Sequence, residues 1–231
     1  MPIKALLFDL DDTLYDEKQF VQSGFIIVAE FIECKFKINK ENFYKILIDI
    51  FNNGSRGNIF NLALERVNVA YEEDIIQSMV KIYRGHNPKI RLAEDIKSLI
   101  IKLKEIYSLG IVTDGYFEVQ KKKVQALKLE ELFDSIIYTD KYGREYWKPN
   151  VLGYKLALEE LGDILPEGTV YIGDNPHKDF IGAKKVGITT VRVLYRNREY
   201  SNVRLNKKYE ADYEIRELQE IIDVLKVLKN K

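Results

Sequence analysis

The sequence contains one cysteine and no long apolar run, and each of these absences excludes a class of protein. Cys34 cannot form an internal disulfide, which fits a reducing, cytoplasmic compartment and predicts Cys34 as a small apolar filler of a core. No stretch approaches the ~20 apolar residues that a membrane-spanning helix needs. Because Met1 and Pro2 lead directly into the first expected strand, we also expect no signal peptide.

An excess of either charge is also absent. Lys+Arg and Asp+Glu both number 36, so the formal net charge is zero. Without a basic excess we expect no nucleic-acid partner, and without a membrane span we expect no membrane partner. With 231 residues, 46% of them hydrophobic, the chain can form one sizeable core or a core plus a smaller domain. Either a monomer or a homodimer fits these data.

The hydrophobic pattern changes twice along the chain. Residues 17–88 show helical periodicity and no convincing strand, with apolar residues three and four apart from Phe43 to Phe51. From Leu92 onward, short apolar runs alternate with helical patterns, and the sequence ends with an expected edge strand at 213–215 and a helix. This alternation predicts a doubly wound parallel, Rossmann-like α/β sheet. We therefore expect a core domain of residues 1–16 and 89–231 and a small all-helical domain of residues 17–88.

Acidic residues follow the first apolar run of the chain. The run from Ala5 to Phe8 stops at Asp9, and Asp11 stands one residue beyond. Two carboxylates at the end of a buried strand are costly unless a cation, a proton or hydrogen bonds offset their charge. Mg2+ prefers hard oxygen ligands of this kind, and a carboxylate can also attack phosphorus. An isolated Asp-x-Asp-x-Thr is, however, equally typical of a turn or a helix cap.

Three further polar elements follow expected strands or start expected helices. Thr113-Asp114-Gly115 supplies a hydroxyl and backbone N–H groups at a strand-to-helix turn, which suit phosphate oxygens. Lys148, before Pro149, is a compact cation that can screen an attacking carboxylate from a phosphate's charge. The stretch 173–179 offers Asp174 as a metal carboxylate and Asp179 as a partner of a metal-bound water or of Lys148. Taken singly, each element also fits a turn, a surface loop or a cap.

Together and in this order, the four elements resemble the four motifs of the haloacid dehalogenase superfamily, over nearly the whole chain. Gln120 and Lys123 are similar to residues on the helix after motif two in phosphatases of this superfamily that carry a helical cap. The helical segment 17–88 has the size and pattern of that cap. Motif two more commonly reads Thr-Asn-Gly, so Asp114 departs from the pattern and adds negative charge. We interpret the triple lysine 121–123 mainly as a solvated helix face.

The resemblance implies a Mg2+-dependent phosphatase that acts through an aspartyl-phosphate. Asp9 would be the nucleophile, and Asp11 would protonate the leaving oxygen and then deprotonate the hydrolytic water. Mg2+ would be held by Asp9, Asp174 and the backbone carbonyl of Asp11.

The resemblance also implies roles for the surrounding residues. Thr113 and Lys148 would hold phosphate oxygens, with Asp114 beside them in the substrate site. Asp179 would support Mg2+ or Lys148 from outside the ligand set. In the cap, Arg56 lies on a glycine-flanked loop and could reach the leaving group, although a solvent-exposed position remains open.

Several activities remain open on this scaffold. Family dehalogenases lack an acid at the position of Asp11, so dehalogenation is not expected. A sugar phosphomutase would use the same core, and a binding or regulatory module could use it without turnover. The chain is similar to small archaeal and bacterial phosphatases of the superfamily, some assigned to triose or sugar phosphates and others to nucleotides. We therefore expect a small phosphomonoester as substrate, with glyceraldehyde 3-phosphate as an example.

Overall fold

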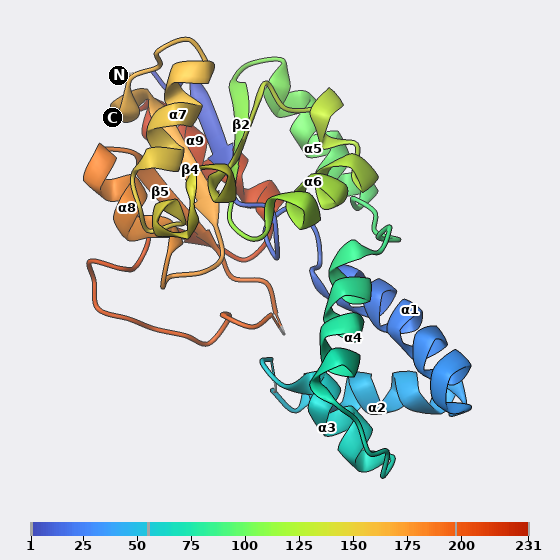
Figure 1. Ribbon diagram of the computed structural model, residues 1–231. Coiled ribbons are helices and arrows are strands. Elements are labelled where there is room, and N and C mark those ends of the chain that lie inside the picture. The colour runs from blue at the N-terminus through green and yellow to red at the C-terminus, as the bar shows by residue number, and fades with distance from the viewer. Residues whose placement is uncertain (1, 55, 197, 231) are drawn as a thin grey trace. The chain divides into compact units, whose positions relative to one another are not determined.

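The computed structural model describes residues 2–54, 56–196 and 198–230 (Figure 1). The chain divides into two compact units, one formed by Met1–Asp16 with Arg91–Lys231 and the other by Glu17–Ile90. The expected helical domain, 17–88, ends two residues before the end of the second unit. Among the described residues, no helix combines the length and the apolar character needed to cross a membrane.

The larger unit contains a parallel sheet of six strands, which confirms the α/β prediction. Its strands lie in the order β3-β2-β1-β4-β5-β6. Their bounds are β1 (Ala5–Phe8), β2 (Ser108–Thr113), β3 (Ser135–Tyr138), β4 (Thr169–Gly173), β5 (Thr189–Val193) and β6 (Tyr213–Ile215). In the centre, Leu6 pairs with Leu109 on one side and with Val170 on the other. Strand β1 is buried along its whole length, which explains why it reads as a continuous apolar run.

Helices cover both faces of this sheet. Their bounds are α5 (Glu94–Lys104), α6 (Phe117–Ala126), α7 (Leu152–Glu160), α8 (Asp179–Val186) and α9 (Ile221–Lys229). Tyr154 of α7 and Phe180 of α8 pack with Leu7 and Val112 of the sheet in one buried cluster. Because successive strand residues point to opposite faces, Phe8 faces away from this cluster and packs edge-on against Phe133.

The direction in which the chain adds strands to the sheet reverses between β1 and β4. The chain runs outward from β1 through β2 to β3, and then returns through α7 to β4 on the other side of β1 (Figure 1). In doubly wound sheets, ligands bind at such a reversal, beyond the carboxyl ends of the strands. Asp9 directly follows β1 and Asp174 directly follows β4. The fold thus brings two of the expected site residues to the point where a ligand is expected.

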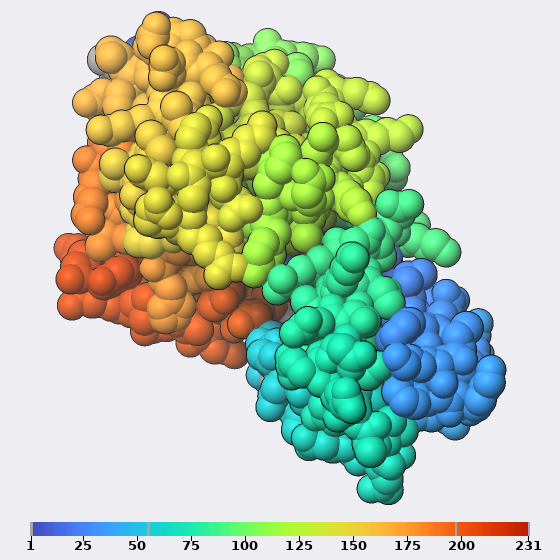
Figure 2. All heavy atoms as spheres, in the orientation of Figure 1, coloured from blue at the N-terminus to red at the C-terminus, as the bar shows by residue number. Residues whose placement is uncertain are grey.

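The smaller unit consists of helices in its described part. They are α1 (Lys18–Phe36), α2 (Lys40–Asn52), α3 (Ile59–Arg66) and α4 (Glu73–Gly85). Their apolar faces meet around Phe25, Phe43 and Met79. In the space-filling view, the blue to teal atoms of this unit form one continuous body (Figure 2). Cys34 is exposed, so its expected role as a core filler is wrong. It stands two residues beyond the buried Ile32, and two residues turn the helix about 200°, away from the packed face.

Candidate active site

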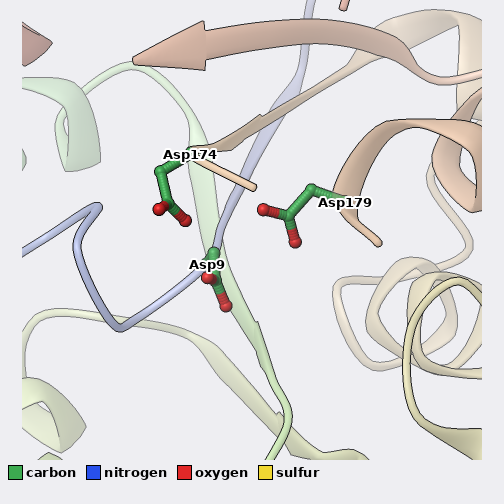
Figure 3. A group of neighbouring side chains, drawn as sticks. All are labelled: Asp9, Asp174 and Asp179. Atoms are coloured by element: carbon green, nitrogen blue, oxygen red, sulfur yellow. The ribbon is translucent and has the colours of Figure 1, made fainter. Parts of the chain in front are cut away.

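Three buried carboxylates lie together beyond the ends of β1 and β4 (Figure 3). Asp9, Asp174 and Asp179 each offer an oxygen, and these oxygens lie within 4.8 Å of one another. The backbone N–H of Asp9 donates to the carbonyl of Ile172 at 2.8 Å, which fixes Asp9 beside β4. Burial raises the pKa of Asp9, against the opposing effect of Lys148. Burial also raises the pKa of Asp174, and the nearby charges of Asp179 and Asp9 raise it as well. A buried acidic group of this composition could hold a metal ion.

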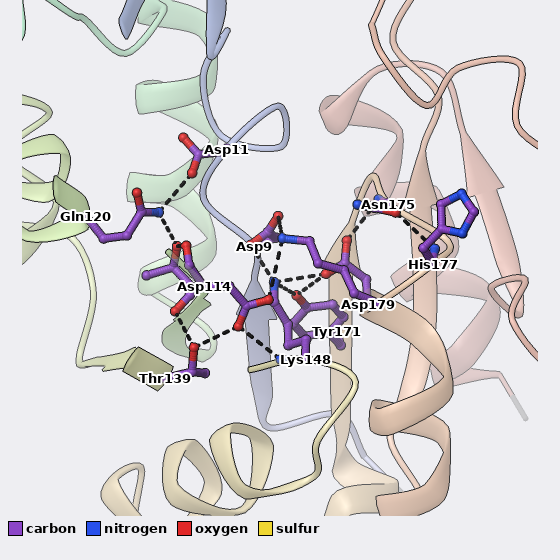
Figure 4. A network of polar contacts seen from close by, with 12 residues as sticks. Asp9, Asp11, Asp114, Gln120, Thr139, Lys148, Tyr171, Asn175, His177 and Asp179 are labelled. Carbon is purple, nitrogen blue, oxygen red and sulfur yellow. Dashed lines mark hydrogen bonds and ion pairs between the residues drawn. The ribbon is translucent and has the colours of Figure 1, made fainter. Parts of the chain in front are cut away.

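Lys148 is the cation at the centre of this cluster (Figure 4). Its Nζ lies 2.5 Å from Asp9 Oδ1 and 2.9 Å from Asp179 Oδ1, and it donates to the Tyr171 hydroxyl at 2.9 Å. Burial alone would lower the pKa of Lys148, but Asp179 and Asp9 outweigh it and raise the pKa. Asp9 and Asp179 therefore favour the charged ammonium form of Lys148, which joins the two carboxylates.

Gly173 makes room for Asp179. A Cβ on Gly173 would lie 2.6 Å from Asp179 Oδ2 and 2.9 Å from its Cγ. The same Oδ2 accepts a hydrogen bond from the backbone N–H of Asn175 at 2.9 Å. Because a real Cβ does not approach a carboxylate this closely, only glycine at the end of β4 allows Asp179 to take this position.

The side chain of Asp11 has a separate set of partners. Its Oδ1 accepts hydrogen bonds from Lys123 Nζ and from the Tyr15 hydroxyl, both at 2.7 Å, and its Oδ2 accepts from Gln120 Nε2 at 2.8 Å. Burial opposes ionisation of Asp11, but Lys123 and these hydrogen bonds outweigh it and lower the pKa. Asp12, with a φ of 51°, turns the chain so that Tyr15 returns to Asp11.

The interpretation of the triple lysine 121–123 as a solvated helix face is wrong for Lys123. Its side chain is 4% exposed and forms an ion pair with Asp11, so it does not belong to the solvated helix face. Gln120 lies three residues earlier on α6, and residues three apart share one side of a helix. That side faces the turn after β1, because Gln120 and Lys123 both reach Asp11.

The turn after β2 joins the two groups of carboxylates. Gln120 Nε2 donates to Thr113 Oγ1 at 2.6 Å as well as to Asp11. Asp114 Oδ1 accepts hydrogen bonds from Thr139 Oγ1 at 2.7 Å and from the backbone N–H of Lys148 at 3.0 Å. The structure therefore brings Thr113 and Asp114 next to Asp11 and Lys148, from three separate segments of the chain.

Arg56 belongs to the smaller unit and contacts Phe51 there. Its Nη1 donates to the carbonyl of Phe51 at 2.7 Å, and its guanidinium lies 4.0 Å from the centre of the Phe51 ring. Ser55, in the same loop, lies outside the described residues. A contact of Arg56 with a leaving group stays a prediction.

Sequence reasoning missed two basic residues near the site. Lys178 Nζ lies 3.6 Å from Asp114 Oδ2 and 3.9 Å from Asp9 Oδ2. Arg192 is fully buried on β5 and donates from Nε to the carbonyl of Asp174 at 3.2 Å. A signal existed for each: Lys178 stands inside an acidic motif, and Arg192 interrupts the apolar strand 189–193.

The fold and these strand-end residues define a hydrolase family. A model of the haloacid dehalogenase-like hydrolases matches residues 6–193. The chain therefore belongs to this family, and it falls on the branch whose named members are phosphatases. It is 34% identical to the glyceraldehyde 3-phosphate phosphatase of Methanocaldococcus jannaschii, over 98% of this chain and 99% of that protein.

Two other relatives extend the comparison. The pyrophosphatase PpaX of Halalkalibacterium halodurans is 29% identical, over 98% of this chain and 99% of that protein. The crystal structure of a phosphatase of this family from Thermococcus onnurineus superposes with a TM-score of 0.62 at 27% identity, covering 96% of this chain and 98% of that one. The similarity thus extends over the helical unit as well as the core.

Proposed function

We propose that the protein hydrolyses a small phosphomonoester through an aspartyl-phosphate on Asp9. One observation carries the proposal: Asp9 and Asp11 stand one residue apart in the sequence, but their side chains have different partners. Asp9 lies with Lys148 and the acidic cluster, whereas Asp11 is held by Lys123, Gln120 and Tyr15. Two carboxylates with different partners can act as nucleophile and as acid–base group in one reaction.

The two steps follow from these roles. In the first step, a carboxylate oxygen of Asp9 bonds to phosphorus, the ester P–O bond breaks, and the leaving oxygen takes a proton from Asp11. Asp11 enters this step protonated, which is the form that Lys123 and the hydrogen bonds to its carboxylate disfavour by lowering its pKa. In the second step, Asp11 takes a proton from water, the water oxygen bonds to phosphorus, and the P–O bond to Asp9 breaks. Inorganic phosphate leaves, and both aspartates return to their starting states. Lys148 and the Thr113 hydroxyl stabilise the charge on the phosphoryl oxygens in both steps.

The acidic cluster fits Mg2+. Its donors are all oxygens, they are buried, and the described part of the site has more carboxylates than cations: Asp9, Asp114, Asp174 and Asp179 against Lys148 and Lys178. Asp9, Asp174 and the backbone carbonyl of Asp11 would hold the ion, with Asp179 supporting the ion or Lys148. When bound, Mg2+ neutralises phosphate charge and acts as a Lewis acid.

The relatives support a triose or sugar phosphate as substrate. Five of them are named glyceraldehyde 3-phosphate phosphatase, so this ester is the first compound to test. A second candidate, inorganic pyrophosphate, comes from the relatives named pyrophosphatase PpaX. In both cases the helical segment 17–88 is the proposed cap domain, and Arg56 is the residue of it that we propose for recognition of the leaving group.

The test is phosphate release from para-nitrophenyl phosphate, a panel of triose, sugar and nucleotide phosphates, and pyrophosphate. We expect turnover with Mg2+ and a loss of at least ~100-fold in EDTA, because charge neutralisation by the ion is worth several kcal/mol. Returning the same sample to Mg2+ should restore the rate. Equal rates with and without EDTA would contradict the metal role. A folded protein that binds Mg2+ but releases phosphate from no compound would favour a phosphomutase or a binding module.

Gly173→Ala tests the acidic cluster directly. The new Cβ would displace Asp179 from its position beside Lys148 and the backbone of Asn175. Loss of such a supporting interaction lowers metal affinity by about 10–100-fold, which titration calorimetry with Mg2+ measures. Gly85→Ala is the matched control, because no atom lies within 4 Å of the position that its Cβ would take. Unchanged Mg2+ affinity in Gly173→Ala would rule out a metal site that depends on Asp179.

A further inference from the structure

Lys178 lies between two carboxylates of the site. It is the residue before α8, and its Nζ lies 3.6 Å from Asp114 Oδ2 and 3.9 Å from Asp9 Oδ2. These separations are ion-pair distances, longer than a hydrogen bond. The side chain is 28% exposed, whereas that of Lys148 is fully buried. Lys178 is thus a cation at the edge of the site, held by charge and not by short hydrogen bonds to these two acids.

The two lysines face different oxygens of the proposed nucleophile. Lys148 binds Oδ1 of Asp9, and Lys178 faces Oδ2. Lys148 is also engaged by Asp179 and Tyr171, so its donors have partners within the protein. An anion that approaches Asp9 on the Oδ2 side therefore meets Lys178.

Asp114 is suited to hold Lys178 in this place. Its Oδ1 is fixed by Thr139 and by the backbone N–H of Lys148, which orients the whole carboxylate. Its Oδ2 is buried, has no hydrogen-bond partner among the described residues, and is the oxygen that faces Lys178. An asparagine could keep the Oδ1 contacts, but it would present an NH2 group or a neutral oxygen to the ammonium.

Asp114 and Lys178, counted together as a carboxylate and an ammonium, add no net charge to the site. The acidic cluster and Lys148 contribute three carboxyl groups and one ammonium group, a ratio that suits a divalent cation. Asp114 and Lys178 together add one carboxyl group and one ammonium group, so the excess of carboxyl over ammonium groups stays at two. Either residue alone would change this excess by one. The two residues are therefore expected to act as a unit.

We propose that Lys178 is a second phosphate-binding cation of this active site and that Asp114 is the residue that positions it. The proposal builds on the function proposed above and adds two residues to it. Lys178 contacts the oxygens of the phosphoryl group on the Oδ2 side of Asp9, and Lys148 acts from the Oδ1 side. A donor aimed at developing charge in a partly closed site contributes about 10²–10³-fold to the rate.

The experiment compares the wild type with Lys178→Met, Lys178→Arg, Asp114→Asn and the double variant Asp114→Asn/Lys178→Met. The first readout is the affinity for orthovanadate and inorganic phosphate in saturating Mg2+, and the second is the affinity for Mg2+ alone. We expect Lys178→Met to weaken vanadate binding and kcat/KM by about 100-fold without weakening Mg2+ binding, since it removes a positive charge beside the carboxylates. Lys178→Arg should recover part of the loss because it keeps the charge.

The double variant shows whether Asp114 acts by positioning Lys178 or contributes to binding independently of Lys178. If Asp114 acts through Lys178, Asp114→Asn should cost about 10-fold, and the double variant should resemble Lys178→Met alone. Lys185→Met, on the exposed side of α8, is the control for removal of a lysine from this helix. Wild-type vanadate affinity in Lys178→Met, or losses that multiply in the double variant, would overturn the proposal. Because the binding readouts do not depend on turnover, they decide it even if no tested ester is hydrolysed.

Discussion

Asp9→Asn should lower the rate of ester hydrolysis by at least ~10⁴-fold, because loss of the proposed covalent nucleophile removes the reaction path itself. The amide is isosteric with the carboxylate but has no anionic oxygen to bond to phosphorus. Asp9 is 2% exposed and lies 2.5 Å from Lys148, so water cannot readily take its place. The measurement is steady-state phosphate release with saturating Mg2+, on the best substrate of the panel.

The control for Asp9→Asn must show that the protein still folds. Burying a neutral amide costs less than burying a carboxylate, and Lys148 keeps its partner Asp179, so we expect an unchanged circular dichroism spectrum and cooperative melting. Asp223→Asn on α9, where the side chain is 76% exposed, should keep the wild-type rate. A folded Asp9→Asn protein that retains a tenth of the wild-type rate would show that Asp9 is not the nucleophile.

The positions of Asp9, Thr113 and Asp174 could be predicted because each follows an apolar run. In a parallel sheet, the carboxyl ends of strands share one edge, so residues that end separate runs converge without any knowledge of their contacts. The pairing of Lys148 with Asp179 was also foreseen, as one of two options for Asp179. These predictions needed only the alternation of strands and helices along the chain, which indicates a parallel sheet, and the chemistry of the residues that follow the strands.

The partners of Asp11 and Asp114 could not be found in this way. Lys123 is 112 residues from Asp11 in the sequence, and Lys178 is distant from both Asp9 and Asp114. Which side of α6 faces the site depends on how the helix packs on the sheet, and a run of three lysines gives no periodicity to decide it. The exposed Cys34 shows the same limit: composition predicts the average burial of a residue type, but helix rotation decides the single case.

Lys148→Met should destabilise the core unit by about 3–5 kcal/mol in EDTA, the cost of leaving buried charges without their partner. The Lys148 side chain is fully buried, and its removal leaves Asp9 and Asp179 facing each other. Urea unfolding followed by tryptophan fluorescence measures the change, because Trp147 is the single tryptophan of the chain and lies in the core unit. Methionine keeps most of the volume of the lysine stem, so packing loss contributes little.

Mg2+ should restore part of the stability lost in Lys148→Met. An ion that binds the folded acidic cluster stabilises it by RT ln(1 + [Mg2+]/Kd), and the cluster without Lys148 carries one more uncompensated negative charge. We therefore expect Mg2+ to raise the urea midpoint more in Lys148→Met than in the wild type. Lys226→Met, which removes an ion pair with both side chains more than two-thirds exposed, should change the midpoint little in either condition. If Lys148→Met matched the wild type in EDTA and gained nothing from Mg2+, Asp9 and Asp179 would be uncharged in the folded protein, and the acidic cluster would not be a cation site.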